Sequence, residues 1–364
     1  MYRYLSHDAL ARYGVAVRAA WLYVDFMSTN DSVERSRIAV VGSYGTGMTM
    51  WLDRVPDRGE TLGGARFSAG PGGKGSNQAI GAARLGAQVR LLTAVGDDEF
   101  GAAARRLWRE EGVDASGVVT VDAATMVGVI LVEPDGENRI VIAPGALDLV
   151  TPEHVGGFAE AIAGSDLLMV CNEIPADVVV AALRLAQDHR VATLYNPAPA
   201  RDLPAEARGL VDYLTPNFGE ARVLAGLDSA DNAGQSVQAD EILDRLRERF
   251  DATIVLTAGG DGAYVDDPAA GRSHVPPVTP PEIVDTTGAG DAFNAALAVA
   301  LCRGDDPVTA TRYAVAAGAF AVSRPEVIPG LATPDDLAAL LAENSPPDPA
   351  GAAVFPGRDR PDPI

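Results

Sequence analysis

The chain has 364 residues, of which 47% are hydrophobic and 6% aromatic, enough to build one large core or two moderate ones. Its formal net charge of −21 argues against a nucleic-acid-binding protein, because such proteins neutralise phosphates with a basic surface. An ordinary globular enzyme is the default. Any phosphorylated ligand must then be held by local features such as helix N-termini, a few basic side chains or a metal ion.

The two cysteines, Cys171 and Cys302, lie in apolar runs without the spacing of a metal or redox motif. We expect two buried free thiols in a reducing compartment, so the predicted location is the cytoplasm. The sequence has no uninterrupted apolar stretch of about 20 residues that would span a membrane. The predicted partners are small molecules, with neither nucleic acid nor membrane among them.

The two ends of the chain differ from its centre. Residues 1–36 contain a mildly signal-like run, but Arg18 and Asp25 interrupt it and no small-residue cleavage site follows. We predict a poorly structured N-terminal extension there, and a disordered, proline-rich tail over 342–364. One enzyme domain is expected between them, over 37–341.

In this central part, short β-branched runs alternate with longer amphipathic ones. The first predicted strand spans 37–44, and helices ending at Gly86 and Gly112 flank a second strand at 89–96. The alternation continues to about residue 260, with strands predicted at 166–172, 191–196, 213–217 and 253–260 and helices at 178–190, 218–227 and 239–250. The pattern predicts an α/β fold with a doubly wound, mainly parallel sheet.

Two stretches break the alternation. The segments ETLGGARFSAGPGG at 60–73 and MVGVILVEPDGENRIVIAPG at 126–145 are typical of antiparallel strands joined by turns, the second with a hairpin turn at 135–138. We predict a small antiparallel β lid formed by about 44–70 and 126–145. It would cover a site at the carboxyl ends of the parallel strands.

The motif DTTGAGDAFN at 285–294 places small residues between a strand and a helix that begins near Asp291. Backbone N–H groups at such a helix start form an anion hole, and Gly288 and Gly290 let the chain approach the anion closely. A carboxylate at Asp291 could accept a proton from a hydroxyl nucleophile while the N–H groups stabilise a transferring phosphoryl group. The alternative is an ordinary helix N-cap after a glycine-rich turn.

Three other motifs point the same way. GPGGKGSNQA at 70–79 is a second glycine-rich loop that enters a helix, and it differs from a Walker A loop because Gly75 follows Lys74. TPNFGE at 215–220 puts Asn217 and Glu220 on one face of a starting helix, as Mg²⁺ and phosphate ligation requires. LTAGGDG at 256–262 ends a strand in a glycine loop suited to a nucleotide. Alone, each motif fits an ordinary helix or strand terminus.

Together and in this order, the motifs resemble the ribokinase-like carbohydrate kinase family, with NPAPARDLP at 196–204 and GGKGSNQA closest to its ribokinase members. The resemblance covers about 37–341. It implies ATP-dependent transfer of the γ-phosphoryl group to a primary sugar hydroxyl, with ATP and Mg²⁺ as cofactors and a homodimer joined through the β lid.

The resemblance also assigns roles to residues. The catalytic set is the base Asp291 with the anion hole Gly288, Ala289 and Gly290. The sugar-side set is Gly72, Gly73, Lys74, Asn77, Glu173 and Asp291. The nucleotide and phosphate set is Asn217, Glu220, Thr257, Gly259 and Gly262, and the metal candidates are Glu220, Asp285 and Thr287. Asp285 and Thr287 would serve K⁺, an optional cofactor because RPEVIPG at 324–330 departs from the family's cation loop.

One departure lies after the first strand, where the family has Asn-x-Asp to bind sugar hydroxyls. Here Gly45 and Gly47 occupy those positions, which predicts weak ribose binding in a widened pocket. Either Thr46, Thr49 or Asp53 recognises the hydroxyls, or the acceptor is a larger sugar, a sugar phosphate or a nucleoside. The alternatives to a sugar kinase are a nucleoside kinase on the same fold and a catalytically silent regulator that binds sugar or nucleotide.

Overall fold

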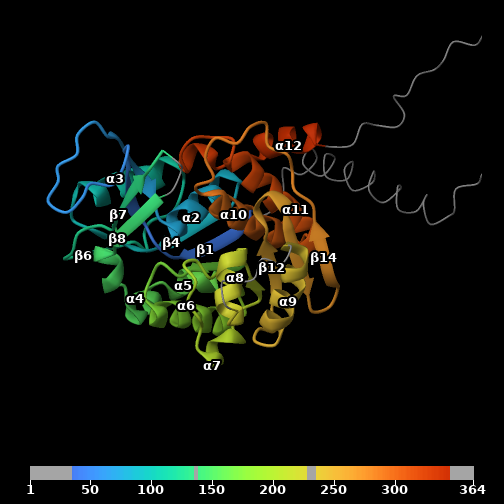
Figure 1. Ribbon diagram of the computed structural model, residues 1–364. Coiled ribbons are helices and arrows are strands. Elements are labelled where there is room, and N and C mark those ends of the chain that lie inside the picture. Colours follow the sequence, from blue (N-terminus) through green and yellow to red (C-terminus); the bar gives the residue numbers. More distant parts are fainter. Residues whose placement is uncertain (1–34, 135–137, 228–234, 345–364) are drawn as a thin grey trace, which may run out of the picture.

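The computed structural model describes residues 35–134, 138–227 and 235–344 (Figure 1). The predicted N-terminal extension up to residue 34 and the predicted tail from residue 345 lie outside this part. The predicted domain end at 341 falls inside the last helix, α12 (Pro334–Glu343). Among the described residues, every helix is too short or too polar to cross a membrane.

The body of the molecule is built on an eight-stranded sheet. Its order is β14 (Gly271–Val275), β13 (Ala263–Asp267), β12 (Thr253–Thr257), β11 (Tyr213–Leu214), β10 (Ala192–Asn196), β9 (Leu167–Cys171), β1 (Arg37–Val41) and β4 (Gln88–Leu92). From β12 to β4 all neighbours are parallel, whereas β13 is antiparallel to both β12 and β14. This confirms the mainly parallel sheet.

Helices cover both faces of this sheet, so the strands are buried on both sides (Figure 1). One face carries α2 (Lys74–Arg84), α3 (Glu99–Glu110), α10 (Ala289–Cys302), α11 (Pro307–Ala321) and α12. The other carries α4 (Pro152–Gly157), α5 (Ala159–Ala163), α6 (Ala176–His189), α7 (Ala205–Arg208), α8 (Phe218–Ala225) and α9 (Gln235–Arg247). In β1, Ile38 and Val40 enter the first core while Ala39 and Val41 enter the second. The doubly wound arrangement is therefore confirmed.

A separate four-stranded sheet projects from the body beside α3 (Figure 1). Its order is β3 (Arg66–Gly72), β2 (Gly45–Trp51), β7 (Val127–Val132) and β8 (Asn138–Ala143). The outer pairs are antiparallel, as expected for the lid, but the central pair β2–β7 is parallel. The predicted hairpin turn lies largely outside the described residues. We call this sheet the β lid.

Two local predictions need correction. The predicted strand at 89–96 is split at Thr93, because β4 pairs with β1 whereas β5 (Ala94–Gly96) leaves the large sheet to pair with β6 (Val119–Val121). Of the two cysteines, both free, Cys171 is buried but Cys302 is only half-buried at the end of α10. Burial raises the pKa of the Cys171 thiol to about 11, so this group stays protonated at neutral pH.

Candidate active site

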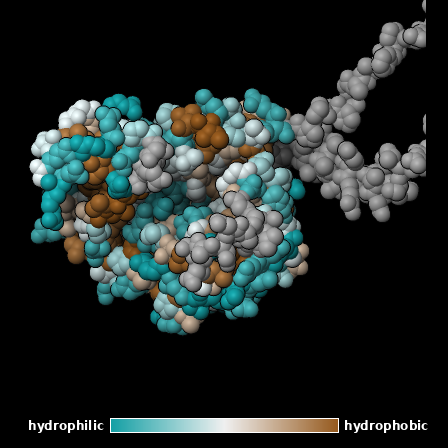
Figure 2. Space-filling view, viewed as in Figure 1, coloured by the Kyte–Doolittle hydropathy of each residue, from teal (hydrophilic) through white to brown (hydrophobic). Residues whose placement is uncertain are grey.

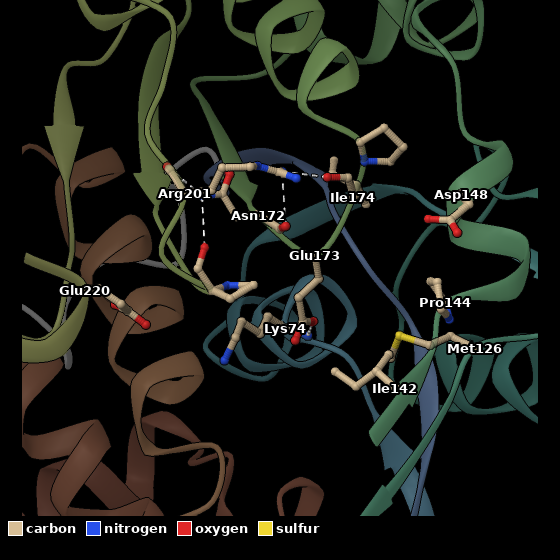
Figure 3. Close-up of a pocket in the computed structure, with 12 residues that line it drawn as sticks. Lys74, Met126, Ile142, Pro144, Asp148, Asn172, Glu173, Ile174, Arg201 and Glu220 are labelled. Carbon is tan, nitrogen blue, oxygen red and sulfur yellow. Dashed lines mark hydrogen bonds between the residues drawn. The ribbon is translucent and has the colours of Figure 1, made fainter. Parts of the chain in front are cut away.

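A cavity of about 480 Å³ lies between the β lid and the carboxyl ends of the parallel strands (Figure 3). Figure 2 shows the hollow, with hydrophobic residues gathered over the lid beside it. The lining residues are Lys74, Met126, Ile142, Pro144, Asp148, Asn172, Glu173, Ile174, Pro175, Pro199, Arg201 and Glu220. Three of the predicted site residues, Lys74, Glu173 and Glu220, are therefore brought together.

The start of α2 forms one side of this cavity. Gly73 takes φ 91°, and a Cβ there would lie 2.6 Å from the Cα of Tyr44, so only glycine lets the loop pass this close to the first strand. Glu173, just beyond β9, accepts hydrogen bonds from the Lys74 backbone N–H at 2.9 Å and from the Ser43 hydroxyl. A carboxylate thus binds the N-terminus of α2, where the helix dipole favours negative charge.

Asp291 lies in the first turn of α10 and is buried. Its Oδ2 accepts a hydrogen bond from Asn77 Nδ2 at 2.8 Å, and its Oδ1 accepts one from Gln78 Nε2 at 3.1 Å. The amides of α2 therefore orient the carboxylate from the other side of the site. Asn77 was predicted as a sugar-side residue, but here its amide nitrogen contacts Asp291, and its Oδ1 is buried without a partner among the described residues.

A chain of buried polar groups behind Asp291 was not predicted from the sequence. Gln78 Nε2 also donates to Asn196 Oδ1 at 3.2 Å, and Asn196 Nδ2 donates to the Thr215 carbonyl. The Thr215 hydroxyl donates to Asn294 Oδ1, and Asn294 Nδ2 donates to the Gly290 carbonyl at 2.7 Å. The chain connects the carboxylate to the glycine loop. In the sequence, Asn196 in NPAPA and Gln78 in SNQA were the residues that could have indicated this chain.

The glycine loop itself is confirmed as the start of α10, one turn before the buried acid. Gly288 is the N-cap with φ 80°, and a Cβ there would lie 2.6 Å from Val327 Cγ1. Gly290 is helical, and no described atom lies within 4 Å of the position its Cβ would take. The requirement for positive φ therefore falls on Gly288 and not on Gly290, and the space beside Gly290 is open, whereas Ala289 packs partly against the core.

One cation in the site, Lys74, interacts with three carboxyl groups, those of Asp291, Glu173 and Glu220. Burial would lower the pKa of Lys74, but the carboxylates of Asp291 and Glu173 outweigh it and raise that pKa. Burial raises the pKa of Asp291, and the Lys74 charge with the Asn77 and Gln78 amides offsets part of this rise. Burial likewise raises the pKa of Glu220. Figure 3 shows the Lys74 side chain pointing toward the Glu220 side of the cavity.

Of the predicted nucleotide residues, only Glu220 lines the cavity. Asn217 and Glu220 form a capping box at the start of α8, each side chain bonded to the backbone N–H of the other at 2.8 Å. Thr257 lies beside Asn217 at the end of β12. Gly259 and Gly262 follow with φ 54° and 86°, in the turn between β12 and β13. The glycine turn is where the sequence predicted it, but Thr257, Gly259 and Gly262 do not line the cavity.

Asp285 lies outside the cavity and joins two loops. Its carboxylate accepts hydrogen bonds from the backbone N–H of Thr287 at 2.9 Å and of Glu326 at 3.2 Å. The segment 324–330 is thereby tied to the start of α10. Within the described ranges, no group of three His, Cys, Asp or Glu side chains forms a metal-binding cluster.

The space beside Gly45 is filled, contrary to the predicted widening. A Cβ at Gly45 would lie 2.2 Å from the Cε of Met126, which precedes β7 and whose carbonyl accepts the Thr46 N–H at 2.9 Å. At Gly47 the nearest atom to a Cβ is Ile130 Cδ1 at 3.6 Å, so a Cβ would fit there in ordinary van der Waals contact. The thioether of the residue just before β7 therefore occupies the space of one missing side chain.

Comparison with known proteins identifies the family. Residues 36–334 match the pfkB family of carbohydrate kinases. The ribokinase of Bacillus subtilis is 36% identical over 307 residues, 84% of this chain and 99% of that protein. The ribokinase of Lactococcus lactis is 34% identical over 290 residues, 79% of this chain and 91% of that protein. The structure of Arabidopsis thaliana ribokinase complexed with ribose and ATP has a TM-score of 0.78 at 24% identity, over 85% of this chain and 99% of that one. The chain therefore belongs to the pfkB family of carbohydrate kinases, as the motifs predicted.

Proposed function

We propose that this kinase transfers the γ-phosphoryl group of ATP to the primary hydroxyl of a pentose or a related sugar. The observation that carries the proposal is the buried Asp291 carboxylate, held by two amides at the open first turn of α10. This arrangement joins a proton acceptor and an anion site in one turn of helix.

In this reaction Asp291 accepts the proton of the sugar hydroxyl as its oxygen bonds to the γ-phosphorus and the bond to ADP breaks. The N–H groups at the start of α10 stabilise the charge on the transferred group, and the open space beside Gly290 leaves room for it. Lys74 supplies a positive charge between Asp291 and Glu220. These groups are positioned before the substrates arrive, which is where most electrostatic catalysis originates.

Mg²⁺ would enter with the ATP phosphates. The protein offers it one acidic side chain of α8, Glu220, a donor set typical of Mg²⁺ sites that rely on phosphate oxygens. When bound, the ion neutralises charge on the phosphates. Asn217 and the glycine turn at Gly259 and Gly262 would hold the nucleotide, with Thr257 beside them.

A monovalent cation would bind between Asp285, Thr287 and the segment 324–330. Asp285 already bridges these two loops, and Val327 packs against Gly288, so this segment contacts the anion hole. Initial rates at equal ionic strength in K⁺, Na⁺ and tetramethylammonium test this proposal. We expect the highest rate in K⁺, whereas equal rates in all three would overturn it.

The β lid also offers a surface for a second copy of the chain. Met50, Phe67, Val129 and Val141 share the lid face opposite the cavity and are exposed, Val141 by 69%. Exposed apolar patches of this kind mark protein interfaces. We expect a dimer in analytical ultracentrifugation that Val141→Asp converts to a monomer. A wild-type monomer at assay concentration would rule the dimer out.

The use of ATP together with the free, protonated Cys171 thiol supports a cytoplasmic enzyme. Purified protein labelled with a thiol reagent under denaturing conditions should show both cysteines reduced.

A coupled assay of ADP release, across pentoses, hexoses, their phosphates and nucleosides, tests the function. We expect turnover with a pentose or pentose derivative, and a product phosphorylated on its primary hydroxyl by NMR. The matched control is Asp291→Asn. Absence of sugar-dependent ADP release with every acceptor would overturn the proposed kinase activity.

A further inference from the structure

We propose that the acceptor turns an edge without free hydroxyl groups toward the β lid, and that Met126 is the residue that selects it. The acceptor class is a pentose that is deoxygenated on that edge or carries an apolar substituent there, in preference to free D-ribose. This inference rests on the proposed kinase function and concerns its specificity.

The two walls of the cavity differ in chemistry (Figure 3). On the lid side, Met126 and Ile142 lie next to Pro144, and their side chains offer no strong hydrogen-bonding group, while the exposed carboxylate of Asp148 lies beyond Pro144. Arg201 and Glu220 lie on the far side, and Lys74 and Glu173 lie between the two (Figure 3). A hydroxyl pressed against Met126 and Ile142 would lose its water without gaining a partner from them, which lowers kcat/KM by about tenfold.

Met126 is held in this wall by the structure around it. Its side chain is 8% exposed and occupies the space that any side chain at Gly45 would need. Its backbone is fixed by the hydrogen bond from Thr46 to its carbonyl. The thioether therefore stays against the base of β2, where a polar side chain from position 45 could otherwise have reached the acceptor.

Several polar groups on the body side are already engaged. Asn172 Nδ2 donates to the carbonyls of Pro199 and Arg201, and Asn172 Oδ1 accepts from the Tyr195 hydroxyl. Arg201 Nη2 donates to the carbonyls of Asn172 and Ile174. These bonds use side chains that would otherwise compensate for hydroxyls left unpaired at the lid wall. The edge of the acceptor that faces Met126 and Ile142 therefore gains no hydrogen bond from Asn172 or Arg201.

The test compares kcat/KM for D-ribose, 2-deoxy-D-ribose and methyl β-D-ribofuranoside. We expect at least one of the last two to exceed D-ribose by about tenfold, the scale of one unpaired hydroxyl. A higher kcat/KM for 2-deoxy-D-ribose indicates a deoxygenated edge, and a higher kcat/KM for methyl β-D-ribofuranoside indicates a substituted edge. A kcat/KM for D-ribose at or above both others would overturn the inference.

Substitutions at Met126 connect the preference to this residue. Met126→Gln keeps the length of the side chain and adds a hydrogen-bonding amide, so the preference against D-ribose should shrink by about tenfold. Met126→Leu is the apolar control and should keep the preference. Equal preferences in the Gln and Leu variants would refute the role of Met126.

A second pair of variants guards against a Met126 variant that fails to fold. Ile142→Thr adds a hydroxyl to the cavity wall, and Ile140→Thr adds the same hydroxyl two residues earlier on the same face of β8, outside the cavity lining. Only Ile142→Thr should move the acceptor ratio toward D-ribose, and equal shifts in both variants would count against the inference. Loss of ADP release with all acceptors in the wild-type protein would instead refute the kinase function itself.

Discussion

The parallel body and the β lid differ in the burial of their strands. In β9 every residue from Leu167 to Cys171 is buried, because helices cover both faces of the large sheet. In β8 of the lid, Ile140, Val141 and Ile142 are exposed by 57%, 69% and 52%. The proposed base and its amide partners belong to the body, whereas the wall proposed to select the acceptor belongs to the lid.

This difference separates chemistry from selection. A carboxylate that must stay within hydrogen-bond reach of its partners benefits from a close-packed surrounding. Side chains of a sheet exposed on both faces can change with little cost to folding. We therefore expect changes in the body to alter turnover or stability strongly, and changes in the lid to alter acceptor choice.

The largest effect is expected at Asp291. Asp291→Asn should lower kcat by roughly 10² to 10⁴, the usual contribution of a positioned proton acceptor, while ATP affinity changes little. Steady-state kinetics and nucleotide titration measure the two quantities. Turnover near that of the wild type would contradict the role of Asp291 as base.

In the body, Leu168 of β9 is fully buried in the core. Leu168→Ala should lower the free energy of unfolding by about 2–5 kcal/mol, because it removes apolar contacts and leaves a cavity. Urea unfolding followed by circular dichroism checks this value. A loss below about 1 kcal/mol would show that the body is packed less tightly than its burial indicates.

The glycine loop should separate folding from catalysis. Gly288→Val forces a β-branched residue into positive φ against Val327, so it should lower stability by about 1–3 kcal/mol and abolish activity. Gly290→Val points into open space and should keep the melting temperature but lose activity by blocking the phosphoryl group. Full activity in Gly290→Val would show that the loop is an ordinary helix start and not an anion site.

The pH dependence should report the environment of Asp291. Its raised pKa places the acid limb of kcat/KM above the range of an ordinary aspartate, since the base works only when deprotonated. Lys74→Met removes the charge that offsets this rise, so the limb should move to still higher pH, whatever the loss in absolute rate. If the acid limb does not move, the charge of Lys74 does not influence the group that titrates in kcat/KM.

The smallest effect is expected in the lid. Ile140→Thr exchanges one exposed β-branched side chain for another, so it should change the free energy of unfolding by less than about 0.5 kcal/mol. The same urea experiment as for Leu168→Ala gives the comparison. A loss above about 1 kcal/mol would show that the lid contributes to the core.

Much of the fold and part of the site could be predicted because their signals are local. Gly86 ends α2 with φ 95°, and Gly73 and Gly288 begin helices with the positive φ that favours glycine. The alternation of strands and helices gave the layered body. The split at Thr93 was not predictable, because it depends on which partner each half of the segment pairs with.

By itself, the sequence determined the order of the elements, the glycine loops and the carboxylate at the start of α10, because each depends on neighbours within a few residues. Only the tertiary structure decided what these groups touch. Gln78 binds Asp291 from 213 residues away along the chain, and Met126, just before β7, fills the space beside Gly45. An empty position in a sequence motif does not define an empty volume, because close packing lets distant side chains fill it.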